Sequence, residues 1–272
     1  MLTEPEDEDL QPPAVMEDHD GGEASEMTLW EHLEELRWVI LKSGVAFVIA
    51  GALIGIGLLN FKAALDWPLD RAEAMAQVEG GVDIRTREVT EIFSVIFQLL
   101  FFGSLGMSLP FALYFLARFI APGLTKEERQ LLRPVCLALL ALFFAGCALS
   151  YFFVLPMMFF VSIKLNAFMG FTEMWSPGSY YGSVVSITLA LGLIFQFPVV
   201  LVALVHLGIL EVDTLRRGRR YAFLILVIFS AFVTPTGDPV TLFMVAVPLY
   251  GLYEGAIAVG QRLLSRNPMN DY

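Results

Sequence analysis

Acidic side chains gather where the first apolar segment of the chain begins. Glu31, Glu34 and Glu35 are spaced three and four residues apart, so on a helix they share one face. A second acidic pair, Glu127 and Glu128, lies in a polar stretch between two later apolar segments. A carboxylate matches the guanidinium of arginine in a bidentate fork, so two such sites would suit a pair of arginines. The alternative is that these acids are solvated charges that stabilise helix amino termini.

The residues expected of an enzyme or a metal site do not occur together. His19, His32 and His206 are scattered, and the chain has no phosphate loop, nucleophile elbow or zinc-binding histidine pair. Cys136 and Cys147 lie in one apolar run, about 16 Å apart along a helix, so they cannot form a disulfide with each other. We therefore expect a protein that is not an enzyme and that holds no metal or cofactor.

The composition indicates a membrane protein. The chain has 272 residues, of which 57% are hydrophobic, and its mean hydropathy is +0.67, which excludes a soluble single-domain enzyme. A helix needs about 20 apolar residues to cross the bilayer. We predict an all-α polytopic membrane protein with six transmembrane helices, at about 39–59, 92–116, 134–163, 181–207, 221–233 and 240–253. The last two segments are short, and they fit a short transmembrane hairpin.

The net charge of −11 belongs to one end of the chain. Residues 1–26 hold ten of the 28 acids and no lysine or arginine, so the rest of the chain carries 18 acids against 17 bases. We predict a disordered acidic tail at 1–26, a membrane domain at 27–266 and a polar C-terminal end at 267–272.

The bases predict the orientation of the spans. With the N-terminus inside, twelve bases fall in cytoplasmic segments: Arg37, Lys42, Arg118, Lys126, Arg129, Arg133, Arg216, Arg217, Arg219, Arg220, Arg262 and Arg266. Five fall outside: Lys62, Arg71, Arg85, Arg87 and Lys164. Because bases concentrate in cytoplasmic loops, we expect both termini in the cytoplasm.

A small secondary transporter is the alternative function at this stage. Such proteins usually carry ionisable groups near the membrane midplane and paired interruptions in two halves of the chain. Here the span centres hold Gln98 and Gln196 but no formal charge, and no inverted repeat is evident.

A series of short motifs, in order, resembles one known family. They are His32–Arg37 (HLEELR), Trp67–Leu69, Glu91–Phe93, Phe119–Arg129 (FIAPGLTKEER), Phe195–Pro198, Thr234–Asp238 and Pro248–Glu254. They are similar to the motifs of TatC, the core subunit of the twin-arginine protein translocase. Two positions depart from the family pattern: Gln196 stands where glutamate is common, and Leu242 stands where a polar residue is often found.

The resemblance implies a concave six-helix bundle in the cytoplasmic (inner) membrane that binds twin-arginine signal peptides of folded cargo. It also implies single-span partners, TatA and TatB, a homo-oligomeric receptor complex, no nucleic acid, and transport driven by the proton-motive force. The implied signal-peptide-binding residues are Glu35, Glu128, Arg37, Phe119, Lys126, Arg129 and Gln196, the first two holding the arginine pair. The implied structural residues at the periplasmic cap are Pro68 and Asp238, and the implied partner-binding residues are Thr234, Leu242 and Glu254.

Overall fold

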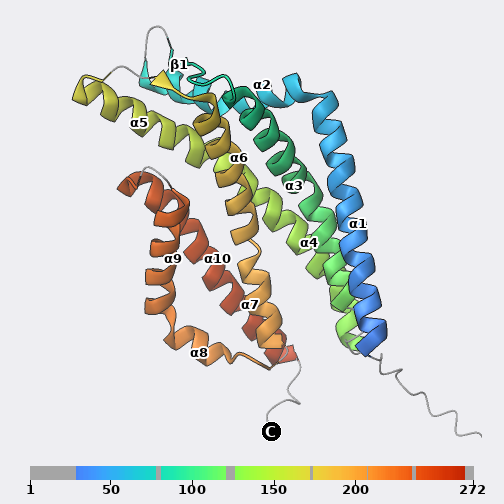
Figure 1. The fold of residues 1–272 in the computed structure, drawn as a ribbon. Coiled ribbons are helices and arrows are strands. Elements are labelled where there is room, and N and C mark those ends of the chain that lie inside the picture. The colour runs from blue at the N-terminus through green and yellow to red at the C-terminus, as the bar shows by residue number, and fades with distance from the viewer. Residues whose placement is uncertain are drawn as a thin grey trace, which may run out of the picture.

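A computed structural model describes residues 29–77, 81–120, 126–171, 174–206, 208–234 and 237–266. The predicted tail (1–26) and C-terminal end (267–272) lie outside the described residues. The described chain is almost entirely helical, as Figure 1 shows, so the predicted all-α membrane fold is confirmed. Five of its helical segments are long and apolar enough to cross a membrane: His32–Ile56, Glu91–Phe119, Arg133–Met169, Pro177–His206 and Pro239–Leu263.

Eight helices and one π-helical turn form the spans and their junctions. They are α1 (Leu29–Ile56), α3 (Glu91–Ile120), α4 (Lys126–Leu149), η2 (Ser150–Val154), α5 (Leu155–Met169), α6 (Pro177–Ile194), α7 (Phe197–His206), α9 (Arg219–Val233) and α10 (Pro239–Arg266). A short helix, α8 (Val212–Arg217), connects α7 to α9. The third predicted span is therefore one continuous rod made of α4, η2 and α5, whereas the fourth is broken between α6 and α7.

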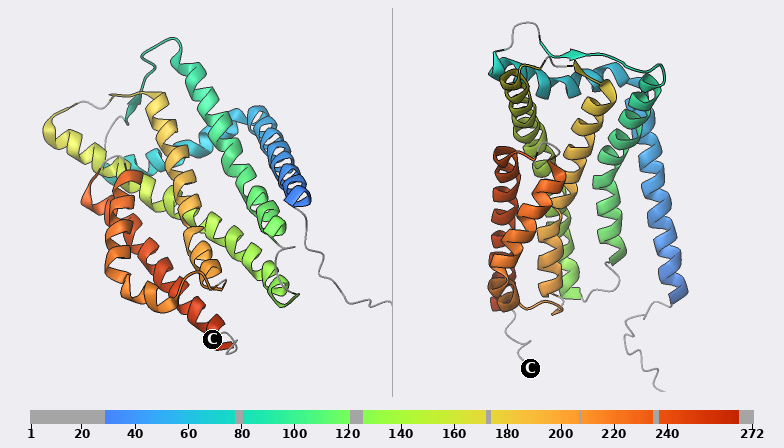
Figure 2. Two further views of the ribbon diagram at one scale, coloured as in Figure 1. Left: turned by 60° about the horizontal axis from the view of Figure 1, so that its bottom comes forward. Right: turned by 60° about the vertical axis from the view of Figure 1, so that its left-hand side comes forward.

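One end of the bundle is covered by a helix that lies across it. The segment predicted as a loop with a short helix instead contains the 19-residue α2 (Leu58–Ala76), which runs over the ends of the long helices (Figure 2, right). Strand β1 (Asp83–Ile84) pairs in parallel with β2 (Met174–Trp175), with Asp83 opposite Met174, so the two connections at this end are joined. We call this end the capped end. All five bases predicted to be external belong to elements at this end, which agrees with their grouping by sequence.

Proline sets the local structure of α2. Pro68 has no N–H, so the carbonyl of Ala64, four residues earlier, loses its helical partner. The hydroxyl of Tyr151, from η2, donates a hydrogen bond to this carbonyl, and the Tyr180 hydroxyl donates to the neighbouring Leu65 carbonyl at 2.7 Å. Pro68 is fully buried within this end of the bundle, and its predicted role in closing the bundle stays a prediction.

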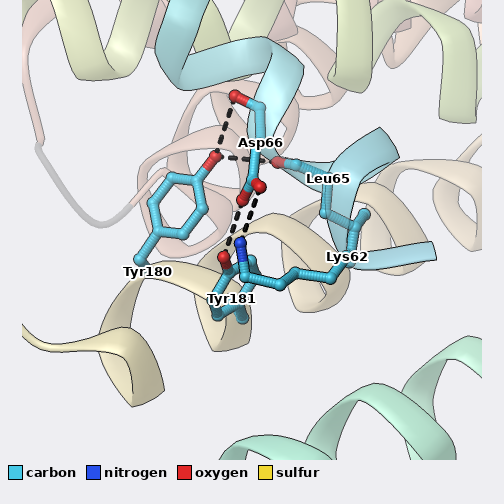
Figure 3. Close-up of polar contacts among 5 residues, drawn as sticks. All are labelled: Lys62, Leu65, Asp66, Tyr180 and Tyr181. Atoms are coloured by element: carbon cyan, nitrogen blue, oxygen red, sulfur yellow. Dashed lines mark hydrogen bonds and ion pairs between the residues drawn. The ribbon is translucent and has the colours of Figure 1, made fainter. Parts of the chain in front are cut away.

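Asp66 joins the cap to α6. Its carboxylate accepts a hydrogen bond from the Tyr181 hydroxyl at 2.6 Å and forms an ion pair with Lys62 at 2.7 Å (Figure 3). The ammonium of Lys62 also lies 5.4 Å from the centre of the Tyr181 ring. The hydrogen bond to Asp66 raises the pKa of Lys62 above its ordinary value of 10.5, so the Lys62 ammonium stays charged at any physiological pH.

Two glycines let α4 and α6 come into close contact. A Cβ on Gly146 would lie 2.6 Å from the Leu191 carbonyl oxygen, and one on Gly192 would lie 2.8 Å from the Cys147 sulfur. Neither position tolerates a side chain without a shift of the helices. This contact fixes α6 as the centre of the bundle, with α3 on one side and α4 on the other.

The terminal hairpin differs from its prediction in one respect. Helix α9 has 15 residues and is short, as expected. The prediction of a short sixth helix is wrong, because α10 has 28 residues and continues past the apolar segment to Arg266. Its last turns pack on α7, where a Cβ on Gly260 would lie 3.3 Å from Val205. The turn between α9 and α10 still ends well short of the capped end (Figures 1 and 2).

We predict that Asp66→Ala lowers the thermal unfolding temperature of the purified protein in detergent. The substitution leaves the buried Tyr181 hydroxyl without its acceptor, which costs about 1–3 kcal/mol. Asp70→Ala is the matched control, because Asp70 is exposed on the same helix. Equal unfolding temperatures for the two variants would contradict a role of Asp66 in holding the cap.

Candidate functional site

The end of the bundle opposite the cap brings the start of the His32–Arg37 motif against the start of the Phe119–Arg129 motif. The ring of His32, in the first turns of α1, stacks on the ring of Phe119 at the end of α3, with 4.3 Å between centroids. Helix α4 begins six residues after α3 ends, so α1, the end of α3 and the start of α4 all lie at this end of the bundle (Figures 1 and 2). We call this place the open end.

Glu35 is one turn further along α1 and is half-buried. Its Oε2 atom is buried and has no hydrogen-bond partner within the described part of the chain. Burial of an unpaired carboxylate oxygen is unfavourable, so this position is suited to a cationic or hydrogen-bond-donating ligand. The neighbouring Glu34 and Arg37 are exposed, and neither forms an ion pair within the described residues.

For the remaining charged candidates at the open end, the structure describes only the backbone. Lys126, Glu128 and Arg129 lie in the first turn of α4, and their side chains are outside what the structure describes. An acid in the first helical turn is favoured by the helix dipole. Their contacts with a ligand stay predictions.

An apolar groove of about 790 Å³ leads from the open end toward the cap. It lies between α3 and α4 on one face of α6, and Phe61 and Leu65 of α2 line the part beneath the cap. At the opposite end of the groove from α2, Tyr114 lies five residues, or about 8 Å of helix, before Phe119. From Phe102 to Tyr114 the groove extends about 18 Å along α3. We call it the α3–α4 groove.

Gln196 has an internal partner. It lies in the break between α6 and α7, and its backbone N–H bonds the Leu193 carbonyl, which leaves the Gly192 carbonyl without its usual partner. The side-chain amide replaces that partner, because Nε2 donates to the Gly192 oxygen at 3.3 Å and to the Leu139 oxygen of α4 at 3.1 Å. Only 7% of Gln196 is exposed. Its amide completes the hydrogen bonding at the break, and its predicted contact with a ligand stays a prediction.

The residues predicted to contact partner helices are also engaged within the chain. The Thr234 hydroxyl is buried and donates to the Ser230 carbonyl at 2.9 Å. Asp238, which was predicted to be structural, lies just before α10, and its carboxylate accepts from the Thr241 N–H at 2.9 Å. Glu254 accepts from Arg219 at 2.8 Å and from the Tyr250 hydroxyl at 3.0 Å, so it ties α9 to α10. Leu242 is partly exposed on α10.

Sequence reasoning missed several residues that position the site. The stacking of His32 on Phe119 links two motifs that are 87 residues apart, and Asp66 of the cap had no motif of its own. The spacing of Lys62 and Asp66 by four residues was the available signal for their ion pair. Within the described residues, no group of three or more His, Cys, Asp or Glu side chains could hold a metal ion.

Comparison with known proteins decides the family. The model of the family described as Sec-independent protein translocase protein (TatC) matches residues 31–248. The chain belongs to the TatC family. The TatC protein of Deinococcus radiodurans is 34% identical over 88% of this chain and 87% of its own length. The TatC protein of a Synechocystis species is 32% identical over 85% of this chain and 87% of its own.

The fold agrees with that of solved TatC. A crystal structure of the twin arginine translocase receptor TatC superposes with a TM-score of 0.69 at 28% identity, covering 86% of this chain and 99% of the other. The family predicted from the motifs is therefore confirmed, and the chain is a multi-pass membrane protein of the Sec-independent translocase. These findings do not favour the transporter alternative.

We predict that Gln196→Met destabilises this TatC protein by about 1 kcal/mol, because the Gly192 and Leu139 carbonyls lose a donor inside the membrane. Gln98→Met is the matched control, since the Gln98 amide nitrogen donates only to the Ser94 hydroxyl, at 3.3 Å, among the described residues. Thermal unfolding in detergent should show a larger loss for Gln196→Met. An equal loss would mean that the broken helix does not depend on the amide.

Proposed function

We propose that this protein is the receptor subunit of a twin-arginine translocase and that it binds the paired arginines of signal peptides at the open end. The observation that carries the proposal is the half-buried Glu35, whose Oε2 is buried and has no partner among the described residues. A cationic donor that reaches this oxygen gains more than it would in water, because the site has a lower dielectric constant. The name of the solved neighbour, a twin arginine translocase receptor, supports this assignment.

Arginine suits the open end better than lysine. A guanidinium has five donors in a planar fork, so it can bond a carboxylate with two parallel hydrogen bonds, whereas lysine acts as a point charge. Two arginines need two acids, and Glu128 in the first turn of α4 is the second. In this proposal Phe119 is held by His32, and Arg37, Lys126 and Arg129 complete the polar surroundings.

The α3–α4 groove would bind the apolar part of the signal peptide. Its length of about 18 Å corresponds to about 12 helical residues, which falls within the 7–15 apolar residues of a secretory signal. The groove starts about 8 Å from Phe119, so the arginines and the apolar segment could be bound at the same time. Helix α2 lies over its far part, so the segment would be held within the membrane.

The terminal hairpin is the proposed site for the single-span partners TatA and TatB. Helix α9 exposes a large apolar surface that includes Leu224, Ile228 and Phe232, the last being 84% exposed. Because Thr234 and Glu254 are engaged internally, contact there would be mostly apolar, with Leu242 as part of the surface. We place both termini in the cytoplasm, the capped end outside the inner membrane, and the proton-motive force as the driver of transport.

We predict that Glu35→Gln weakens binding of an Arg-Arg signal peptide at least about tenfold. The substitution keeps the side-chain shape but removes the charge, and a hydrogen bond to a charged group is worth about 1.5–3 kcal/mol. Glu128→Gln should have the same effect, whereas Glu34→Gln, one position away and exposed, should not. The measurement is fluorescence anisotropy of a labelled peptide with the full-length protein in nanodiscs.

A Lys-Lys peptide serves as the control ligand for these variants. It should bind the unsubstituted protein more weakly than the Arg-Arg peptide, and Glu35→Gln should reduce that difference. If Glu34→Gln and Glu35→Gln behave alike, or if the two peptides bind equally well, the assignment of the arginine site is wrong.

We also predict that Gly106→Leu weakens signal-peptide binding without loss of folding. Gly106 lines the α3–α4 groove, and a Cβ there would meet only Leu189, at 3.9 Å, so the added side chain fills the groove rather than the packed interior. Gly44→Leu is the matched control, because a Cβ there meets nothing within 4 Å. Unchanged affinity for Gly106→Leu, measured with the same peptide, would exclude the groove as the binding site.

A further inference from the structure

A second apolar groove, of about 590 Å³, follows the seam between α1 and α3. We call it the α1–α3 groove. The small side chains of Ala46 and Ala50 lie among its lining residues on α1, while Ile49 of α1 and Phe111 and Met107 of α3 are large and between 46% and 59% exposed. This arrangement of small residues between large ones makes an elongated channel rather than a flat surface. It is separate from the α3–α4 groove, although Met107 and Phe111 line both.

A single charged side chain lines this groove. Lys42 lies toward the open end, next to Trp38, and it forms no hydrogen bond or ion pair within the described residues. The nearest acid along the same stripe of α1 is Glu35, seven residues or about 10 Å of helix away. A lysine in this position extends its ammonium toward the headgroup region, and tryptophan prefers the same depth.

The part of the groove from Lys42 onward is about as long as one leaflet of a bilayer. From Lys42 to Leu53, the last α1 residue that lines it, the helix rises about 16 Å. Half of a hydrocarbon core about 30 Å thick is about 15 Å. A lipid chain whose headgroup lies at Lys42 would therefore end near Leu53, at the middle of the membrane.

We propose that the α1–α3 groove binds one anionic phospholipid of the leaflet on the open-end side, with an acyl chain in the groove and the phosphate at Lys42. The unpaired ammonium selects an anionic headgroup, because a zwitterionic lipid would bring a second cation to the same place. The occupant is a lipid because the one charged residue that lines the groove, Lys42, lies at headgroup depth, where a phosphate is the anion that the membrane itself supplies. The groove shares no lining residue with the proposed arginine site, so this proposal does not rest on the proposed function.

Native mass spectrometry of the full-length protein tests the site. The delipidated protein in detergent is mixed with equal amounts of phosphatidylglycerol and phosphatidylcholine, and the retained lipid is counted for each species. We expect the unsubstituted protein to retain phosphatidylglycerol about fivefold more than phosphatidylcholine, the factor that one lysine near a membrane surface provides. Equal retention of the two lipids would overturn the proposal.

Two variants, each with a matched control, locate the lipid. Lys42→Met should abolish the preference for phosphatidylglycerol, whereas Arg133→Met, which removes an exposed cation from the start of the third span, should keep it. Ala46→Leu should reduce retention of phosphatidylglycerol by filling the groove, whereas Ala52→Leu, at an exposed position outside it, should not. Thermal unfolding without added lipid checks that each variant is folded.

The outcomes separate the proposal from a general affinity for anionic lipid. If Arg133→Met abolishes the preference as fully as Lys42→Met, the lipid is held by the basic surface and not by this groove. If Ala46→Leu retains as much phosphatidylglycerol as Ala52→Leu, the acyl chain does not enter the groove. Either result would overturn the site.

Discussion

A helix inside a membrane cannot leave a backbone carbonyl without a donor, because the hydrocarbon supplies no water. The fold depends on how this constraint is met at its interruptions. At the break between α6 and α7, the carbonyl of Gly192 loses its backbone partner, and the Gln196 amide takes its place while also reaching α4. In α2, Pro68 frees the Ala64 carbonyl, and Tyr151 supplies the hydroxyl. Each replacement hydrogen bond comes from a side chain that also links two helices, so each helix interruption is also a point of contact between helices.

The position of the cap depends on the hydrogen bonds to α2. Tyr151 on η2 and Tyr180 and Tyr181 on α6 all donate to the middle of α2, so this helix is held by two spans that are distant in sequence. In this position α2 covers the part of the α3–α4 groove that Phe61 and Leu65 line. The opposite end of the groove, at Tyr114, is not covered by α2 and is nearer to His32 and Phe119. The two ends of the bundle therefore differ: one is closed by hydrogen bonds and an ion pair, and the other has a buried acid oxygen with no partner in the described chain.

The sequence was sufficient for features that depend on local composition or on motifs. The spans follow from apolar runs, and the family follows from motifs such as His32–Arg37 and Phe119–Arg129. The pairing of β1 with β2 could not be predicted, because two-residue strands 91 positions apart carry no pattern of their own. The length of α10 was underestimated because Glu254 was taken as the end of the span, although apolar residues such as Ile257 and Leu263 continue the helix beyond it.

The close contacts between helices could likewise not be predicted from the sequence alone. The sequence has glycines four residues apart at Gly51 and Gly55, and again at Gly251 and Gly255, a spacing that permits close helix contacts in membranes. Only the first pair meets a neighbour: a Cβ on Gly51 would lie 3.0 Å from the Ser104 hydroxyl, and the second pair has nothing within 4 Å. The tightest approach uses Gly146 and Gly192, which lie on different helices and so share no spacing in the sequence. Which glycine faces a neighbour is decided by the tertiary arrangement.

The position of α1 connects the proposed arginine site to the surrounding membrane. This helix packs chiefly on α3, through Gly51 and Ser104 near its middle and His32 and Phe119 at the open end. The α1–α3 groove follows this seam from Trp38 to Leu53. An acyl chain in the groove would add dispersion contacts along both walls. Because Glu35 is carried by α1, the geometry of the acid depends on how firmly that seam is filled, and the lipid would be part of the support of the site.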